Sequence, residues 1–254
     1  MAQEKTDSSI VPADQSGPQT TPVAPERRMK DTDIRVEMCT VEDAMTIAKG
    51  LRACYSEETW AAKEPAELRP SETVSIQRFA KRLEAILAHK EFAFVKAVLA
   101  STGETIGAAC WGRPDTNSTH DPFRRSALSF YNWQTSLGWS DADVDEMWAS
   151  IIDSWHEGPA EDDKERAQVM KGEPHWYLAL LITWPDFQGR GVARRLLDWA
   201  IEQADATEPV TPMYLKSSAM ARRVYMHVGF VPVGEKTMVR RGPVAQSTEV
   251  KAMS

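Results

Sequence analysis

Residues 180–197 read LLITWPDFQGRGVARRLL, and they are the most informative stretch of the chain. An apolar run stops at Pro185, a loop with two glycines follows, and apolar residues then return at helical spacing. This order predicts a strand, a loop of the size of a diphosphate and the first turn of a helix. The first turn of a helix has backbone N–H groups without partners and carries partial positive charge. The stretch therefore predicts a site for an anion.

The loop over residues 188–193 has the composition that close contact with a diphosphate requires. Gly189 and Gly191 have no Cβ, so the chain can adopt positive φ there and lie close to a ligand. Positive side chains surround the same loop, namely Arg190, Arg194 and Arg195. We therefore expect the loop to wrap a pyrophosphate group.

Spacing argues against two other phosphate-binding motifs. A P-loop requires Lys followed by Ser or Thr after its last glycine, whereas Val192 and Ala193 follow Gly191 here. A dinucleotide fingerprint requires a third glycine at the position that Arg194 occupies, and an acidic residue about 20 residues further on. ATP, GTP and NAD are therefore poor fits.

The loop resembles the signature of a known family. Residues 188–193, Gln-Gly-Arg-Gly-Val-Ala, are similar to the Q/R-x-x-G-x-G/A acetyl-CoA signature of the GNAT superfamily of N-acetyltransferases. Residues 214–230 resemble the family's C-terminal strand and helix, which end in Y-x-x-x-G-F from Tyr225 to Phe230. The resemblance covers His175 to about Val233. It implies an α/β (α+β) fold, with a mostly antiparallel central sheet flanked by helices.

The resemblance also implies an activity, which is transfer of the acetyl group of acetyl-CoA, as cosubstrate, to a primary amine by direct attack in a ternary complex. In the family, the strand before the loop splays from its neighbour, and its backbone pairs with the pantetheine arm. Two of the implied contacts have alternatives, because Ser218 could equally cap the following helix and Arg222 could equally be an ordinary surface charge. The residues that the resemblance assigns to acetyl-CoA are Leu181, Ile182, Thr183, Gln188, Gly189, Arg190, Gly191, Val192, Ala193, Ser218, Arg222 and Tyr225.

Acyl transfer to an amine requires a base for the amine and an acid for the leaving thiolate. The resemblance assigns the acid to Tyr225, for which the alternative is a core tyrosine packed beneath the cofactor. Many family members have a carboxylate at the position of Tyr177, and tyrosine is a poor base near neutral pH. His175 and Glu173 are nearby candidates, His175 being better suited by its ordinary pKa, and both could be strand-edge residues. An ordered water chain is a further alternative.

Composition and charge limit the class of protein and the partners that the chain can have. The chain has 254 residues, 42% of them hydrophobic and nine of them Trp, which is ample for a packed core. The net charge of −7 argues against a nucleic-acid partner, and we expect no membrane contact and no metal. Three scattered cysteines indicate neither a disulfide framework nor a zinc site, and Cys110 is more readily a buried strand residue than a covalent nucleophile. We expect a cytoplasmic protein, with the nucleus as an alternative, and leave the oligomeric state open.

The chain is predicted to have three parts. The two terminal parts are polar and lack a periodic apolar pattern, whereas the central part is the predicted domain. They are a disordered N-terminal arm over residues 1–33, a GNAT N-acetyltransferase domain over 34–241 and a flexible tail over 242–254. Within the domain, a helical insertion over about 113–172 departs from the family pattern, because it separates a predicted strand pair at 92–111 from the strand that follows His175.

The insertion has an expected helix over residues 140–155 and is rich in aromatic side chains. These could line the acceptor site or pack the extra helix onto the sheet, and packing is the preferred interpretation. They are Phe130, Tyr131, Trp133, Trp139, Trp148 and Trp155. We expect a small-molecule amine as the acceptor. The alternatives are a protein or peptide N-acetyltransferase, a transferase for longer acyl groups, and a catalytically inactive CoA-binding sensor or scaffold.

Overall fold

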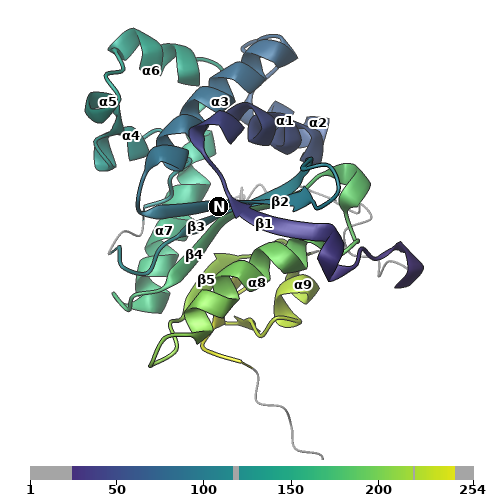
Figure 1. The fold of residues 1–254 in the computed structure, drawn as a ribbon. Coiled ribbons are helices and arrows are strands. Elements are labelled where there is room, and N and C mark those ends of the chain that lie inside the picture. The colour runs from purple at the N-terminus through teal and green to yellow at the C-terminus, as the bar shows by residue number, and fades with distance from the viewer. Residues whose placement is uncertain (1–24, 117–119, 220, 244–254) are drawn as a thin grey trace, which may run out of the picture.

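Apolar and β-branched segments pair into one mixed sheet. The computed structural model describes residues 25–116, 120–219 and 221–243, and its strands run in the order β1-β2-β3-β4-β5-β7-β6 (Figure 1). Among these strands β4 and β5 are parallel, and the other neighbouring pairs are antiparallel. The predicted α/β (α+β) fold with a mostly antiparallel sheet is confirmed. The strands are β1 (Ile34–Met38), β2 (Phe92–Leu99), β3 (Thr105–Gly112), β4 (Trp176–Thr183), β5 (Met213–Lys216), β6 (Val231–Pro232) and β7 (Thr237–Arg240).

Helices cover both faces of the sheet, and each face has its own apolar core (Figure 1). The helices form because apolar residues recur at helical spacing, as in α8, where Leu196, Leu197 and Ala200 are buried together. Within the described ranges, no helix is both long and apolar enough to cross a lipid bilayer. One face carries α1 (Ala44–Cys54), α2 (Glu57–Lys63) and α3 (Glu72–Ala88), and the other carries α8 (Val192–Asp205) and α9 (Arg222–Met226).

The predicted arm and tail are only partly described. Residues 1–24 and 244–254 lie outside the described residues, so the expected disorder there stays a prediction. The rest of the arm forms two short 3₁₀ turns, Pro25–Arg27 and Asp31–Asp33, directly before β1.

The insertion between β3 and β4 is helical, but its helices differ from the predicted one. A single helix over residues 140–155 is wrong, because α6 ends at Trp148 and α7 begins at Glu157 after a 3₁₀ turn, Asp153–His156. The break has a tertiary cause. The buried Ser150 hydroxyl donates to Glu64 (2.8 Å), which fixes the chain where the helix would have continued. The insertion helices are α4 (Ala127–Phe130), α5 (Trp133–Ser136), α6 (Asp141–Trp148) and α7 (Glu157–Met170).

Aromatic residues attach the insertion to α3 and β2. Trp133 and Trp148 are buried in the core on that face, and Tyr131, Trp139 and Trp155 pack against it. Phe130 differs, since it is exposed and stacks on His120. The structure therefore favours packing over an acceptor-lining role for most of this set.

Candidate active site

The sheet splits between β4 and β5. Strand β4 pairs with β5 only over residues 176–178, whereas it pairs with β3 as far as Thr183. The register between β3 and β4 shifts where Cys110 faces Leu180 and Trp111 faces Leu178, so Ala179 is an extra, bulged residue at the start of the split. Beyond the bulge, no described strand pairs with the β5 side of β4, and an extended ligand could add there as a strand.

The glycine loop follows the open part of β4. A 3₁₀ turn, Pro185–Phe187, leads from β4 into it, and Gln188 Nε2 donates to the carbonyl oxygen of Thr183 (3.0 Å). Gly189 (φ +71°) and Gly191 (φ +99°) both adopt positive φ and are exposed. Gly191 directly precedes α8, whose first turn has no side-chain cap. The predicted strand, loop and helix N-terminus are therefore present, with backbone N–H groups available to an anion.

The arginines beside the loop are partly held by protein groups. Arg190 Nε donates to the carbonyl oxygen of Arg27 (3.2 Å), and Met29 N–H donates to the carbonyl oxygen of Arg190 (3.1 Å). Arg194 pairs with Asp198 on α8 (2.6 Å). The N-terminal segment before β1 thus supports the loop through Arg190, an arrangement that the sequence did not indicate.

Tyr225 lies on α9, on the face that carries α8. Its side chain is 6% exposed and packs edge-on against Phe230, in the same cluster as Trp176 and Leu178 of β4. Burial, with a smaller contribution from Tyr55, raises the pKa of the Tyr225 phenol. The hydroxyl is therefore protonated at neutral pH and suited to donate a proton.

Ser218 and Arg222 have protein partners. The Ser218 hydroxyl accepts a hydrogen bond from Ala221 N–H (3.3 Å) in the turn before α9, whose own first turn has no side-chain cap. Arg222 donates to the carbonyl oxygens of Gly234 and Glu235, in the turn between β6 and β7. Their contacts with acetyl-CoA stay predictions.

Tyr177 and His175 lie together at the start of β4. Tyr177 points to the opposite face from its neighbours Trp176 and Leu178, because side chains alternate along a strand. Both rings lie near the ring of Tyr214 on β5. The centroid of the Tyr214 ring is 6.1 Å from that of His175 and 6.2 Å from that of Tyr177. Burial lowers the pKa of His175, whose Nδ1 contacts the carbonyl oxygen of Glu173 (2.7 Å). The imidazole is therefore neutral at pH 7.

The Tyr177 hydroxyl has a carboxylate partner that the sequence did not suggest. It donates to Asp121 Oδ2 (2.9 Å), and the Arg166 guanidinium lies over the Tyr177 ring, 3.6 Å from its centroid. Burial is the main reason that the pKa of Tyr177 is raised well above its ordinary value. Asp121 precedes the insertion helices and Arg166 is on α7, so only the folded insertion brings them to β4.

Cys110 is unsuited to nucleophilic catalysis. It lies on β3 with no exposed surface, and burial raises the pKa of its thiol well above the ordinary value. A thiol held protonated is a weak nucleophile. All three cysteines are free.

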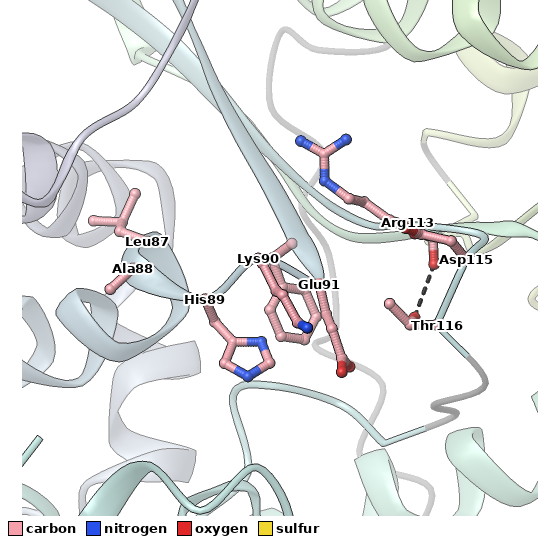
Figure 2. Close-up of a pocket in the computed structure, with 9 residues that line it drawn as sticks. Leu87, Ala88, His89, Lys90, Glu91, Arg113, Asp115 and Thr116 are labelled. Atoms are coloured by element: carbon pink, nitrogen blue, oxygen red, sulfur yellow. Dashed lines mark hydrogen bonds between the residues drawn. The ribbon is translucent and has the colours of Figure 1, made fainter. Parts of the chain in front are cut away.

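A cavity of about 530 Å³ lies at the other end of the β3–β4 pair from the glycine loop (Figure 2). Figure 2 shows His89 and Lys90, which follow α3, on one side of the cavity, and Arg113 and Thr116, which follow β3, on the other. Thr116 Oγ1 donates to the carbonyl oxygen of Arg113 (2.8 Å). Since Gly112 pairs with Tyr177, the cavity begins one residue beyond the position on β3 that faces Tyr177.

Comparison with known families agrees with this geometry. A family model described as an acetyltransferase (GNAT) domain matches residues 160–248, which include most of α7, the strand split, the glycine loop and Tyr225. The resemblance inferred from the motifs is confirmed, since this part of the chain matches the model of a GNAT acetyltransferase domain. No curated protein matches the sequence.

Solved acetyltransferase structures also resemble the chain. A protein described as histone acetyltransferase HPA2 and related acetyltransferase, from Corynebacterium glutamicum, is 18% identical over 85% of this chain and 99% of its own, with a TM-score of 0.45. PaiA N-acetyltransferase from Thermoplasma acidophilum, in complex with coenzyme A, is 13% identical over 82% and 98%, with a TM-score of 0.43. Mosquito arylalkylamine N-acetyltransferase like 5b is 13% identical over 82% and 99%, with a TM-score of 0.47.

Proposed function

We propose that this protein transfers the acetyl group of acetyl-CoA to a primary amine, by direct attack in a ternary complex. The observation that carries the proposal is the position of the strand split next to the glycine loop. The five open residues of β4, 179–183, span about 16 Å at 3.3 Å per residue. If the diphosphate of acetyl-CoA is bound at the loop, its extended pantetheine arm can therefore run back along β4. The thioester then reaches the closed end of the split, at Leu178.

Direct transfer is supported by the thiols and by Tyr225. Cys39 and Cys110 are buried, and burial raises the pKa of the Cys54 thiol to about 12, so none of the three is activated for a covalent intermediate. Tyr225, protonated on the α9 side of the split, is the proposed acid for the leaving thiolate. These free thiols suit the reducing cytoplasm or nucleus, where we place the protein.

The proposed acceptor is a small-molecule amine. The net charge of −7 favours approach of a cationic amine over long range. Transfer to a protein or peptide N-terminus is the alternative, and a panel containing both kinds of acceptor separates them. A CoA-binding sensor without turnover would keep the loop but would not require a proton donor at Tyr225.

The first test is acetyl-CoA binding by calorimetry to wild type, Gly191→Trp and Gly103→Trp. Gly191 and Gly103 both have positive φ and open space around the Cβ position, but Gly103 lies in the turn between β2 and β3. The two variants share backbone strain, and only the first obstructs the loop. We expect Gly191→Trp alone to abolish binding. Equal loss in both variants, or no binding by folded wild type, would refute the proposed cofactor site.

Tyr225→Phe separates an enzyme from a sensor. Removal of the hydroxyl should lower kcat roughly 10²-fold and leave the acetyl-CoA Kd within about twofold, because general acid catalysis contributes at least that factor. Release of free CoA thiol with a panel of amines measures kcat, and Tyr131→Phe, whose hydroxyl bonds to the carbonyl oxygen of His120 in the insertion, is the control. Absence of turnover in wild type would support the sensor.

A further inference from the structure

A buried polar cluster joins the insertion to β4 beside the closed end of the split. Asp121 accepts the Tyr177 hydroxyl through Oδ2 (2.9 Å) and Phe123 N–H through Oδ1 (2.8 Å). Asp163 on α7 accepts Asp121 N–H (3.0 Å) and pairs with Arg166 (3.3 Å). Arg166 in turn covers the Tyr177 ring. The four residues form a closed circuit of contacts, in which Asp121 contributes both its side chain and its backbone N–H.

The circuit is too polar for its burial to be explained by packing alone. Asp121 is 8% exposed and Arg166 is 1% exposed, yet the Nε and Nη1 atoms of Arg166 have no hydrogen-bond partner among the described residues. Two donor nitrogens without partners on a buried guanidinium are a costly arrangement. Such groups are typical of functional sites, where a substrate atom or a bound water takes up the unused donors.

Position connects this circuit to the proposed reaction. Tyr177 directly precedes Leu178, where the split closes and the thioester is proposed to arrive. Tyr225 packs with Trp176 and Leu178 on one face, and Tyr177 points to the other. The two phenols therefore lie on opposite sides of β4, one for each of the two proton transfers that acyl transfer to an amine requires.

We propose that Tyr177 and Asp121 form a proton relay that accepts the proton of the attacking amine. This inference rests on the proposed function. As the new C–N bond forms, a proton leaves the amine nitrogen for Tyr177 Oη, and the hydroxyl proton of Tyr177 passes to Asp121 Oδ2. One N–H bond and one O–H bond break, two O–H bonds form, and Asp121 ends neutral. Tyr177 would be the catalytic residue and Asp121 a positioning and proton-accepting residue that acts through it.

Charge around the relay fits this role. Burial raises the pKa of Asp121 from 3.8 to about 6, so the carboxylate is ionised at neutral pH but more basic than an exposed one. The ionisable groups that face it are Cys110 from β3, Tyr177 from β4, and Asp163 and Arg166 from α7. Arg166, stacked on the phenol, favours negative charge that develops on Tyr177 during the transfer.

The test compares Asp121→Asn with Glu165→Gln in the full chain, using acetyl-CoA and the amine of highest turnover from the panel. Glu165 also joins α7 to the sheet, through Lys216 and Thr237, but does not contact the relay. We expect Asp121→Asn to lower kcat roughly 10²-fold, with the acetyl-CoA Kd within about twofold. In wild type, kcat should fall below a pH of about 6, and this fall should vanish in Asp121→Asn. Glu165→Gln should keep both the wild-type kcat and its pH dependence.

Two further variants keep the relay testable if Asp121→Asn fails to fold. Tyr177→Phe should lose kcat to the same extent, and Asp121→Glu, which keeps a carboxylate, should recover part of it together with the fall at acidic pH. Unchanged kcat in Tyr177→Phe, or an unchanged pH profile in a folded Asp121→Asn, would overturn the relay while leaving the proposed function intact. Absence of acetyl transfer in wild type would overturn both.

Discussion

The two faces of the sheet build their parts of the candidate site in different ways. On the face of α8, one continuous segment supplies β4, the glycine loop and the helix N-terminus, so local backbone geometry is sufficient. On the opposite face, Tyr177 meets Asp121 and Arg166, which lie 56 and 11 residues earlier in the chain and come together only when the insertion docks. The first part depends on glycine conformation and the second on tertiary packing. Damage to one should leave the other intact.

Trp148→Ala should test this separation with the largest effect. The ring is buried between α6 and α3, and Arg82 lies over it at 4.7 Å from the centroid. Removing it should lower the free energy of unfolding by about 3–5 kcal/mol, the range for Trp→Ala in a core. Denaturant unfolding measures this, with the half-buried Trp139→Ala as a control of smaller effect. If acetyl-CoA binding by the folded Trp148→Ala protein is lost as well, the two faces are not independent.

Asp121→Asn should show an effect on stability that depends on pH. Because the folded pKa of Asp121 is raised to about 6, its contribution to stability is complete below the unfolded value near 3.8 and is lost as pH rises through 6. The stability of wild type relative to the variant should therefore fall by up to about 3 kcal/mol between pH 4 and pH 8. Unfolding free energies at both pH values measure it. A difference that is constant with pH would show that the carboxyl does not titrate in this range.

Arg190→Ala should give the smallest of the three effects and should act on the other face. It removes the contact with the Arg27 carbonyl and one positive charge from the loop. The acetyl-CoA Kd should rise roughly tenfold, about 1.4 kcal/mol. Arg194→Ala, which breaks only the pair with Asp198 on α8, is the matched control and should change the Kd less. An equal effect in both variants would mean that charge alone, and not the support of the loop, sets the affinity.

The same division explains what could be predicted from the sequence. The strand, the glycine loop, the helix and the insertion were all predicted, because each depends on neighbours in sequence such as the pair Gly189 and Gly191. Asp121 could not be predicted as a partner of Tyr177, since a single aspartate in a polar segment looks the same whether it is solvated or buried. The predicted helix over 140–155 failed for a similar reason, because Ser150 bonds to Glu64, 86 residues earlier.

The support of the glycine loop by residues before β1 bears on where this chain can be shortened or fused. A chain beginning at Ile34 would keep every described strand, yet it would lose the Arg27 carbonyl and the Met29 N–H that hold Arg190. The smallest unit that preserves the shape of the loop therefore begins near Pro25. An affinity tag or fusion partner joined at the first strand would replace part of the support of the binding site with foreign sequence.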